Sequence, residues 1–153
     1  MNELINTMSM QIPAKSENES FVRAVVAAFC VGLKPTIDEL SDIKTAVSEA
    51  VTNCVVHAYQ KHQSNNDIIT IECKLYSNML QVTISDRGIG IQDIKKAMEP
   101  FYTTAPDDER SGMGFTVMQS FMDTISVNNQ DGGGTVVTMQ KVFTKDNKQV
   151  SGE

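Results

Sequence analysis

The chain has 153 residues, of which 41% are hydrophobic, and its formal net charge at pH 7 is −6. This length suits one domain with its own core, and the hydrophobic content excludes a wholly disordered chain. The acidic balance argues against direct binding of nucleic acid, because proteins that bind the phosphate backbone usually present a basic face. Proteins or a small ligand are therefore the expected partners.

The sequence also predicts a soluble, cytoplasmic protein. Its three cysteines, Cys30, Cys54 and Cys73, each lie in an apolar run, and none has C-x-x-C spacing. Each is therefore expected to pack as a small hydrophobe in a reducing compartment. No stretch approaches the roughly 18 apolar residues of a membrane span, and the N-terminus lacks the basic region of a secretion signal. We expect no membrane partner.

The N-terminal segment is expected to form a strand and then a helix. Residues 4–12 alternate loosely between apolar and polar types, which is typical of an edge strand. Ser16 precedes Glu19 by three residues, a capping-box spacing that predicts the start of a helix running to about Leu33. The apolar face of this helix is predicted to contain Phe21, Val25, Ala28 and Phe29.

A second capping box predicts the next helix. Thr36 precedes Glu39 by three residues, and helical periodicity continues to Tyr59. The stripe expected to face the sheet consists of Leu40, Ile43, Val47, Ala50, Val51 and Cys54. Residues 61–67 are polar and are expected to form a loop.

The remainder of the chain predicts further strands and helices around a long loop. Strands are expected at residues 69–75, 80–84, from about 125, and 135–143, and helices at 94–98 and 114–122. Residues 99–112 show little periodicity, and a loop of this length in a compact domain is often a lid over a site.

These elements predict an α+β fold of one domain. We expect the domain to cover residues 1–144 and residues 145–153 to form a disordered tail. The helices are expected to gather on one face of a mixed, mostly antiparallel sheet, which gives a two-layer sandwich.

Three short patterns in this framework have the chemistry of a nucleotide site. The first consists of Glu49, Asn53 and His57, which are four residues apart on the second predicted helix and so share a face. An amide oxygen is a hard neutral ligand suited to Mg²⁺, and a carboxylate one turn away can deprotonate a nucleophile. On its own, the same row is also typical of a solvated polar helix face.

The second and third patterns are rich in glycine. Asp86, Gly88 and Gly90 follow a predicted strand. There a carboxylate can accept a hydrogen bond from an exocyclic amine such as that of adenine, and glycines let the backbone approach a flat ring. Gly112 and Gly114 open a predicted helix, whose free N–H groups and dipole favour an anion such as a triphosphate. Taken alone, the pattern at Asp86 is also compatible with an ordinary turn, and the pattern at Gly112 with a flexible hinge.

The order of these patterns resembles a known ATP-binding family. E-x-x-x-N on a helix, D-x-G-x-G after a strand and G-x-G-F at a helix start occur in succession, and Gly134-Thr135 follows on a late strand. This set resembles the Bergerat (GHKL) ATP-binding fold, which histidine kinases and type II topoisomerases share. The Walker A sequence of P-loop proteins, G-x-x-x-x-G-K-[ST], is absent from the sequence.

Longer stretches are similar to the anti-sigma F factors of endospore-forming bacteria, one branch of this superfamily. The likeness covers residues 4–142, and its most specific parts are S-E-A-V-T-N at 48–53 and E-R-S-G-M-G-F at 109–115. The resemblance implies a homodimer that binds sigma factor F in an ATP-dependent way. It also implies a kinase that phosphorylates a serine of an anti-anti-sigma factor, with ATP and Mg²⁺ as cofactors.

The resemblance assigns roles to individual residues as well. Glu49 matches the catalytic base for the incoming serine hydroxyl, Asn53 the ligand of Mg²⁺, and Asp86 the acceptor of the adenine amine. Arg23 matches a residue of the partner-binding surface. The full set of implied nucleotide contacts is Asn53, Asp86, Gly88, Gly90, Thr104, Arg110, Gly112, Gly114, Phe115 and Thr135.

Some residues fit two interpretations. Arg23 has apolar neighbours and is also typical of a snorkelling helix arginine, and Arg110 is as compatible with an ordinary surface arginine as with a γ-phosphate contact. His57 is expected to be packed and hydrogen-bonded rather than a phosphoacceptor. The alternatives for the whole chain are a binding module that uses ATP only to set its shape, and a regulator of the related stress-response sigma factor. A carboxylate at Glu49 favours the kinase over the first of these.

Overall fold

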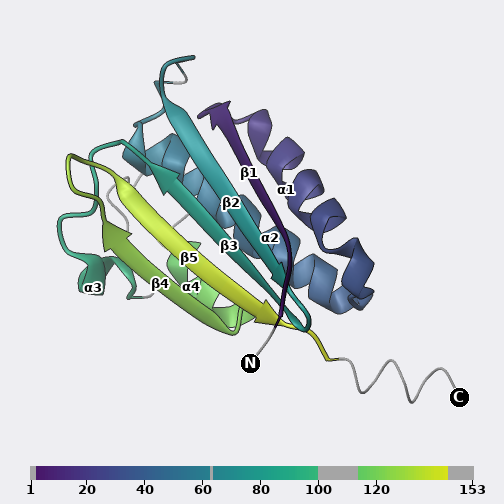
Figure 1. Ribbon diagram of the computed structural model, residues 1–153. Helices are drawn as coiled ribbons and strands as arrows, with labels where there is room; N and C mark the ends of the chain where they lie inside the picture. The colour runs from purple at the N-terminus through teal and green to yellow at the C-terminus, as the bar shows by residue number, and fades with distance from the viewer. Residues whose placement is uncertain (1–2, 63, 100–113, 145–153) are drawn as a thin grey trace, which may run out of the picture.

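A single five-stranded sheet with helices on one face forms the molecule (Figure 1). The computed structural model describes residues 3–62, 64–99 and 114–144. The strand order is β1-β2-β3-β5-β4, and all pairings between these strands are antiparallel, where the sequence predicted a mixed, mostly antiparallel sheet. The strands are β1 (Leu4–Pro13), β2 (Ile68–Tyr76), β3 (Met79–Asp86), β4 (Thr124–Asn129) and β5 (Thr135–Val142). The α+β sandwich is thereby confirmed.

The helices cover the face of the sheet that is turned away from the viewer in Figure 1. They are α1 (Asn18–Phe29), α2 (Ile37–Asn53), α3 (Ile94–Ala97) and α4 (Gly114–Phe121), with short helical turns η1 (Val31–Leu33) and η2 (Cys54–Ala58). Within the described ranges, none of these helices has the length and apolarity needed to cross a membrane.

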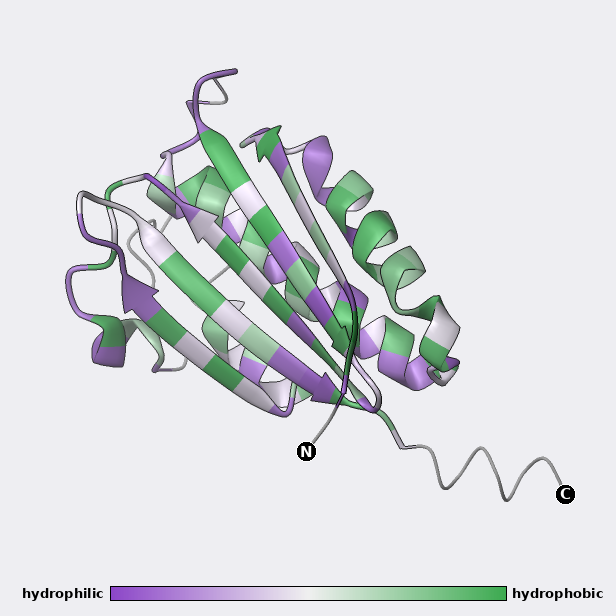
Figure 2. Cartoon of the chain, in the orientation of Figure 1, coloured by the Kyte–Doolittle hydropathy of each residue, from purple (hydrophilic) through white to green (hydrophobic). Residues whose placement is uncertain are grey.

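Alternation along the central strands explains why they form a half-covered sheet. In β2 and β3 every second residue is buried, and Figure 2 shows the corresponding alternation of hydropathy. The apolar residues that face the helices from these two strands are Ile69, Ile71, Cys73, Leu75, Leu80, Val82 and Ile84. The intervening polar residues lie on the opposite face, as the period of two requires.

The buried face of α1 differs from the predicted one. Val22, Val26 and Cys30 are fully buried, whereas Phe21 is 53% exposed. The predicted stripe of Phe21, Val25, Ala28 and Phe29 is therefore wrong, since these residues are exposed or only half-buried. Each helical residue turns by about 100°, so a stripe chosen one position early points well away from the core. Most of α1 is apolar, and its packing against α2 selects the smaller β-branched side chains.

The start of α1 lies within two residues of the predicted one. The helix begins at Asn18, its N-cap position is held by Glu17, and the Glu17 side chain makes no capping hydrogen bond. The backbone N–H of Glu19 donates to the carbonyl of Ser16 at 3.2 Å, and the capping box of these two side chains stays a prediction. The helix ends at Phe29, and η1 continues the turn to Leu33.

The second predicted capping box is confirmed at the start of α2. The backbone N–H of Glu39 donates to Oγ1 of Thr36 at 3.0 Å, and the backbone N–H of Thr36 donates to Oε1 of Glu39 at 2.8 Å. Oε2 of Glu39 also accepts the backbone N–H of Thr144 at 2.8 Å. The last residue described at the C-terminal end is thus tied to the start of α2. Residues 145–153 lie outside the described residues, so the predicted domain boundary stays a prediction.

The end of the second helix is not regular. Its α-helical part stops at Asn53, and the next turn is a π-helix in which the N–H of Tyr59 donates to the carbonyl of Cys54 at 2.9 Å. Single π turns inside helices often occur at functional sites. The predicted helix to Tyr59 is therefore almost right in length but has a widened last turn. All but the first residue of the predicted lid, 99–112, lies outside the described residues.

Candidate nucleotide site

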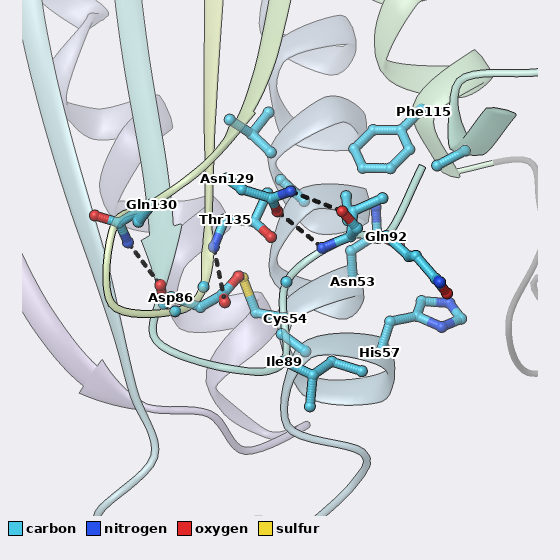
Figure 3. A pocket seen from close by; sticks show the side chains of 18 of the residues that line it. Asn53, Cys54, His57, Asp86, Ile89, Gln92, Phe115, Asn129, Gln130 and Thr135 are labelled. Carbon is cyan, nitrogen blue, oxygen red and sulfur yellow. Dashed lines mark hydrogen bonds between the residues drawn. The ribbon is translucent and has the colours of Figure 1, made fainter. Parts of the chain in front are cut away.

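A cavity of about 580 Å³ lies where α2 and η2 meet the segment after β3 (Figure 3). Its other walls come from α3, the start of α4, and the turn between β4 and β5. A volume in this range is typical of pockets that hold small organic ligands. Apolar lining predominates, and a few polar groups point into it, among them Asp86, Asn53 and His57.

Asp86 is the buried charged group of this cavity. It ends β3 and is 5% exposed. Its Oδ1 accepts hydrogen bonds from the backbone N–H of Gly88 at 2.9 Å and of Thr135 at 3.2 Å, and its Oδ2 accepts from the thiol of Cys54 at 3.5 Å. Burial raises the pKa of Asp86 above its ordinary value of 3.8, although these three hydrogen bonds oppose the shift. A donor on a ligand would therefore stabilise the carboxylate further.

The segment after Asp86 runs very close to η2. The N–H of Ile89 donates to the carbonyl of Ala58 at 3.1 Å, and a Cβ atom at position 88 would collide with that same carbonyl. The hydroxyl of Tyr59 donates to the carbonyl of Ile68 at 2.7 Å and accepts from the N–H of Arg87 at 2.7 Å. These contacts fix the course of the backbone past the cavity, and only glycine fits at Gly88.

Gly88→Ala is expected to lower the free energy of unfolding by about 1–3 kcal/mol, because overpacking forces the backbone apart. Gly32→Ala is the control, since a Cβ there meets nothing within 4 Å and its φ is not in the left-handed region. Urea denaturation of both variants measures the difference. Equal stabilities for the two variants would show that the close approach at Gly88 does not exist in solution.

The turn between β4 and β5 closes the other side of the cavity. Nε2 of Gln130 donates to the carbonyl of Asp86 at 2.7 Å. Asn129 makes two hydrogen bonds to the backbone of Ile91, with Oδ1 accepting at 2.8 Å and Nδ2 donating at 2.7 Å. Sequence reasoning missed Asn129, Gln130 and Ile91 as lining residues, and no short motif marks them. Their role depends on the β4–β5 turn folding back over the residues after β3.

The polar row on α2 and η2 is only partly directed at the cavity. Asn53 and His57 line it, whereas Glu49 is half-buried and is not among the lining residues. Positions four apart on a helix are about 40° out of alignment, so the row drifts around the helix. The amide of Asn53 lies against Gly114, where an added Cβ would come within 3.0 Å of Oδ1. The start of α4 and the end of α2 therefore meet at the cavity.

Most of the predicted site residues come together in this one place. The cavity-lining members of the set are Asn53, Asp86, Gly90, Gly114, Phe115 and Thr135. Gly88 shapes the wall without lining it. Thr104, Arg110 and Gly112 lie outside the described residues. In the part of the chain that the structure covers, no three or more His, Cys, Asp and Glu residues form a metal-binding group.

Arg23 lies on α1 and is not a cavity-lining residue. Its Nη1 donates to Oγ of Ser48 at 3.3 Å and lies 3.9 Å from Oε2 of Glu19. The side chain remains 41% exposed. Its positive charge thus lies at the surface where α1 packs against α2.

Comparison with known proteins gives a consistent family. Residues 12–141 match the histidine kinase-like ATPase domain. The anti-sigma F factor of Clostridium beijerinckii is 51% identical over 138 residues, which is 90% of this chain and 95% of that protein. The anti-sigma F factor of Thermoanaerobacter sp. is 51% identical over 144 residues, covering 94% of this chain and 99% of that protein.

Solved structures show the same fold at low identity. The RsbU and RsbW domains of Rv1364c from Mycobacterium tuberculosis are similar with a TM-score of 0.65 and 18% identity, over 91% of this chain and 33% of that one. The catalytic domain of histidine kinase ThkA gives a TM-score of 0.57 and 16% identity, over 90% of this chain and 99% of that one. The chain therefore belongs to the anti-sigma F factor family and has the GHKL fold of a kinase-like, ATP-binding domain.

Proposed function

We propose that this chain is an ATP-dependent protein serine kinase that also binds and inhibits sigma factor F, and so controls sporulation transcription in the cytoplasm. The observation that supports this best is the buried Asp86 carboxylate in a cavity of about 580 Å³, with the Asn53 amide in the same lining. A hydrogen-bond acceptor for a base and a neutral oxygen ligand for Mg²⁺ then stand in one cavity. Family membership supplies the partners.

At one end of the cavity, the carboxylate of Asp86 accepts a hydrogen bond from the exocyclic amine of adenine. Thr135 lies beside it, because its N–H already donates to Oδ1 of Asp86 at 3.2 Å. Gly88 and Gly90 carry the backbone past the base, and Gly90 has a φ of 78°, which favours glycine. The predominantly apolar lining, which includes Ile89 and Ile91, suits the faces of a flat ring.

At the other end, Asn53 would hold Mg²⁺ and the start of α4 would receive the phosphates. The Asn53 side chain fits this role because its amide lines the cavity directly beside Gly114. A single protein oxygen suffices, since Mg²⁺ in nucleotide sites keeps waters and phosphate oxygens as its other ligands. When bound, the ion neutralises charge on the phosphates. The remaining phosphate contacts in this proposal are Thr104, Arg110, Gly112, Gly114 and Phe115.

Glu49 is the catalytic base in this proposal. It lies one helical turn before Asn53 on α2, and its half-buried position leaves it accessible to a docked protein. The carboxylate takes the proton of the incoming serine hydroxyl while the serine oxygen bonds to the γ-phosphorus and ADP leaves. The acceptor is a serine of the anti-anti-sigma factor.

The surface next to α1 supports a homodimer. Strand β1 is an edge strand, and its Leu4 and Ile5 are 49% and 53% exposed. Phe21 on α1 and Val31 on η1 are also more than half exposed, and α1 lies beside β1 in Figure 1. An open edge and exposed apolar residues are typical of an interface. Sedimentation velocity tests this, and a wild type that stays monomeric at micromolar concentration would contradict it.

Arg23→Ala is expected to weaken binding of sigma factor F about tenfold while ATP affinity stays unchanged, because an exposed arginine is a common interface hot spot. Lys74→Ala is the matched control, since Lys74 is exposed on β2 while its neighbours Cys73 and Leu75 are buried on the helix-facing side. Fluorescence anisotropy with labelled sigma factor F and saturating ATP measures the affinities. Equal losses in both variants would remove Arg23 from the binding surface.

Serine specificity is tested by incubating the chain with γ-labelled ATP, Mg²⁺ and an anti-anti-sigma factor. The proposal predicts acid-stable label on a serine of that partner. ATP binding without transfer would favour the binding module that uses ATP only to set its shape. Acid-labile label on His57 of the chain itself would instead indicate a histidine phosphoacceptor.

A further inference from the structure

Cys54 has a position in the cavity that none of the roles above uses. It is the first residue of η2, is 4% exposed, and lines the cavity beside Asp86 (Figure 3). Its thiol donates a hydrogen bond to Oδ2 of Asp86, with Sγ and Oδ2 3.5 Å apart. Cys30 and Cys73 are buried too, but neither belongs to the cavity lining.

Among the residues that the structure describes, the hydrogen bonds of Asp86 leave one acceptor position for a ligand. A carboxylate has about four such positions, two on each oxygen. Both positions on Oδ1 are taken by the backbone N–H groups of Gly88 and Thr135, at 2.9 and 3.2 Å. One position on Oδ2 is taken by the thiol of Cys54. The single position that remains is on Oδ2, the oxygen whose orientation the thiol controls.

The thiol is the donor in this contact. Its Sγ donates to Oδ2 of Asp86, and an ionised carboxylate oxygen can only accept. The thiol therefore satisfies one acceptor position of Oδ2 from within the protein.

We propose that Cys54 is a positioning residue that sets purine specificity, because its thiol holds Oδ2 of Asp86 with its last acceptor position open to an exocyclic amine. The inference rests on the proposed function, since it takes adenine to lie against Asp86. A 6-amino purine donates into the open position, whereas a 6-oxo purine places a carbonyl oxygen against the carboxylate. Without the thiol, a water can enter and donate one hydrogen bond to Oδ2 of Asp86 and one to the carbonyl oxygen of the 6-oxo purine. The 6-oxo purine is then tolerated better.

The test compares the affinities of ATP and inosine triphosphate, which carries a carbonyl oxygen in place of the 6-amino group. Calorimetry is performed on the wild type, Cys54→Ala, Cys54→Val and Cys54→Ser. The preference for ATP is expected to fall about 3- to 10-fold in the alanine and valine variants, the range of one ordinary hydrogen bond. Serine restores the donor and is expected to restore most of the preference. Cys73→Ala, a buried cysteine of β2, controls for lost packing and should leave the preference unchanged.

The outcomes separate this inference from the function on which it rests. A wild type that binds ATP, with the same preference in the alanine, valine and serine variants, would overturn the role of Cys54 and leave the ATP site intact. Weaker binding of both nucleotides by the same factor would mean that Cys54 only packs. A wild type that fails to bind ATP would overturn the proposed function itself.

Discussion

Glu49→Gln is expected to lower the rate of phosphate transfer to the anti-anti-sigma factor by about 10²- to 10⁴-fold, the usual contribution of a general base. Glutamine keeps the shape of the side chain but cannot accept a proton from a serine hydroxyl at neutral pH. The affinity for ATP is expected to change less than about twofold, because Glu49 is not among the residues that line the cavity. Single-turnover transfer and calorimetry measure the two quantities on the same sample.

Glu72→Gln is the control for this variant, since Glu72 is exposed on β2 between the buried Ile71 and Cys73. It is expected to transfer phosphate at the wild-type rate. A near-normal rate in Glu49→Gln would exclude Glu49 as the base. A parallel loss of ATP affinity would mean that the variant damages the nucleotide site rather than the proton transfer.

Asp86→Asn is expected to weaken ATP binding about 10- to 100-fold, because a hydrogen bond to a charged group contributes about 1.5–3 kcal/mol. The asparagine oxygen can still accept from the N–H groups of Gly88 and Thr135, so the loop should keep its course. Asp131→Asn, in the exposed turn before β5, is the control. Unchanged ATP affinity in Asp86→Asn would place the adenine elsewhere.

Asp86→Asn weakens ATP binding but is expected to raise the stability of the folded protein relative to the wild type as the pH rises. Burial raises the pKa of Asp86 in the folded protein above its ordinary value of 3.8, so the folded state holds this proton to higher pH than the unfolded chain. Wild-type stability therefore falls as pH rises from about 3.8 through the folded pKa. Asp86→Asn does not lose stability in this way, because asparagine does not titrate. The difference in unfolding free energy between the variant and the wild type should grow across that window, and a constant difference would contradict it.

The sheet and the second helix were predictable because their signals are local. The alternation of Ile69, Ile71 and Cys73 sets which face of β2 is buried, and a period of two leaves no alternative. The capping box of Thr36 and Glu39 sets the start of α2, since both of its hydrogen bonds form within one turn. Such features need no knowledge of distant parts of the chain.

The buried face of α1 was not predictable in the same way. Val22 and Val26 are buried, while Phe21 is exposed, although all three are apolar. A helix that is apolar on most sides has several possible buried stripes, and contact with α2 decides between them. Tertiary packing therefore determined what the pattern left ambiguous.

The lining residues of the cavity were predictable where their side chains belong to a motif with a specific chemical role. Asp86 and Asn53 were identified from their motifs, and both line the cavity. Cys54 was expected only to pack, because its hydrogen bond to Asp86 depends on η2 approaching the end of β3. Asn129 and Gln130 were missed for a related reason, since a folded-back turn brings them to the residues after β3.

The central claim is that ATP binds in this cavity with its adenine on Asp86, and a crystal structure with Mg²⁺ and a non-hydrolysable ATP analogue tests it most directly. We predict the exocyclic amine within hydrogen-bonding distance of Oδ2 of Asp86, and the metal on the amide oxygen of Asn53. A nucleotide bound outside the cavity, or with its base turned away from Asp86, would contradict the claim.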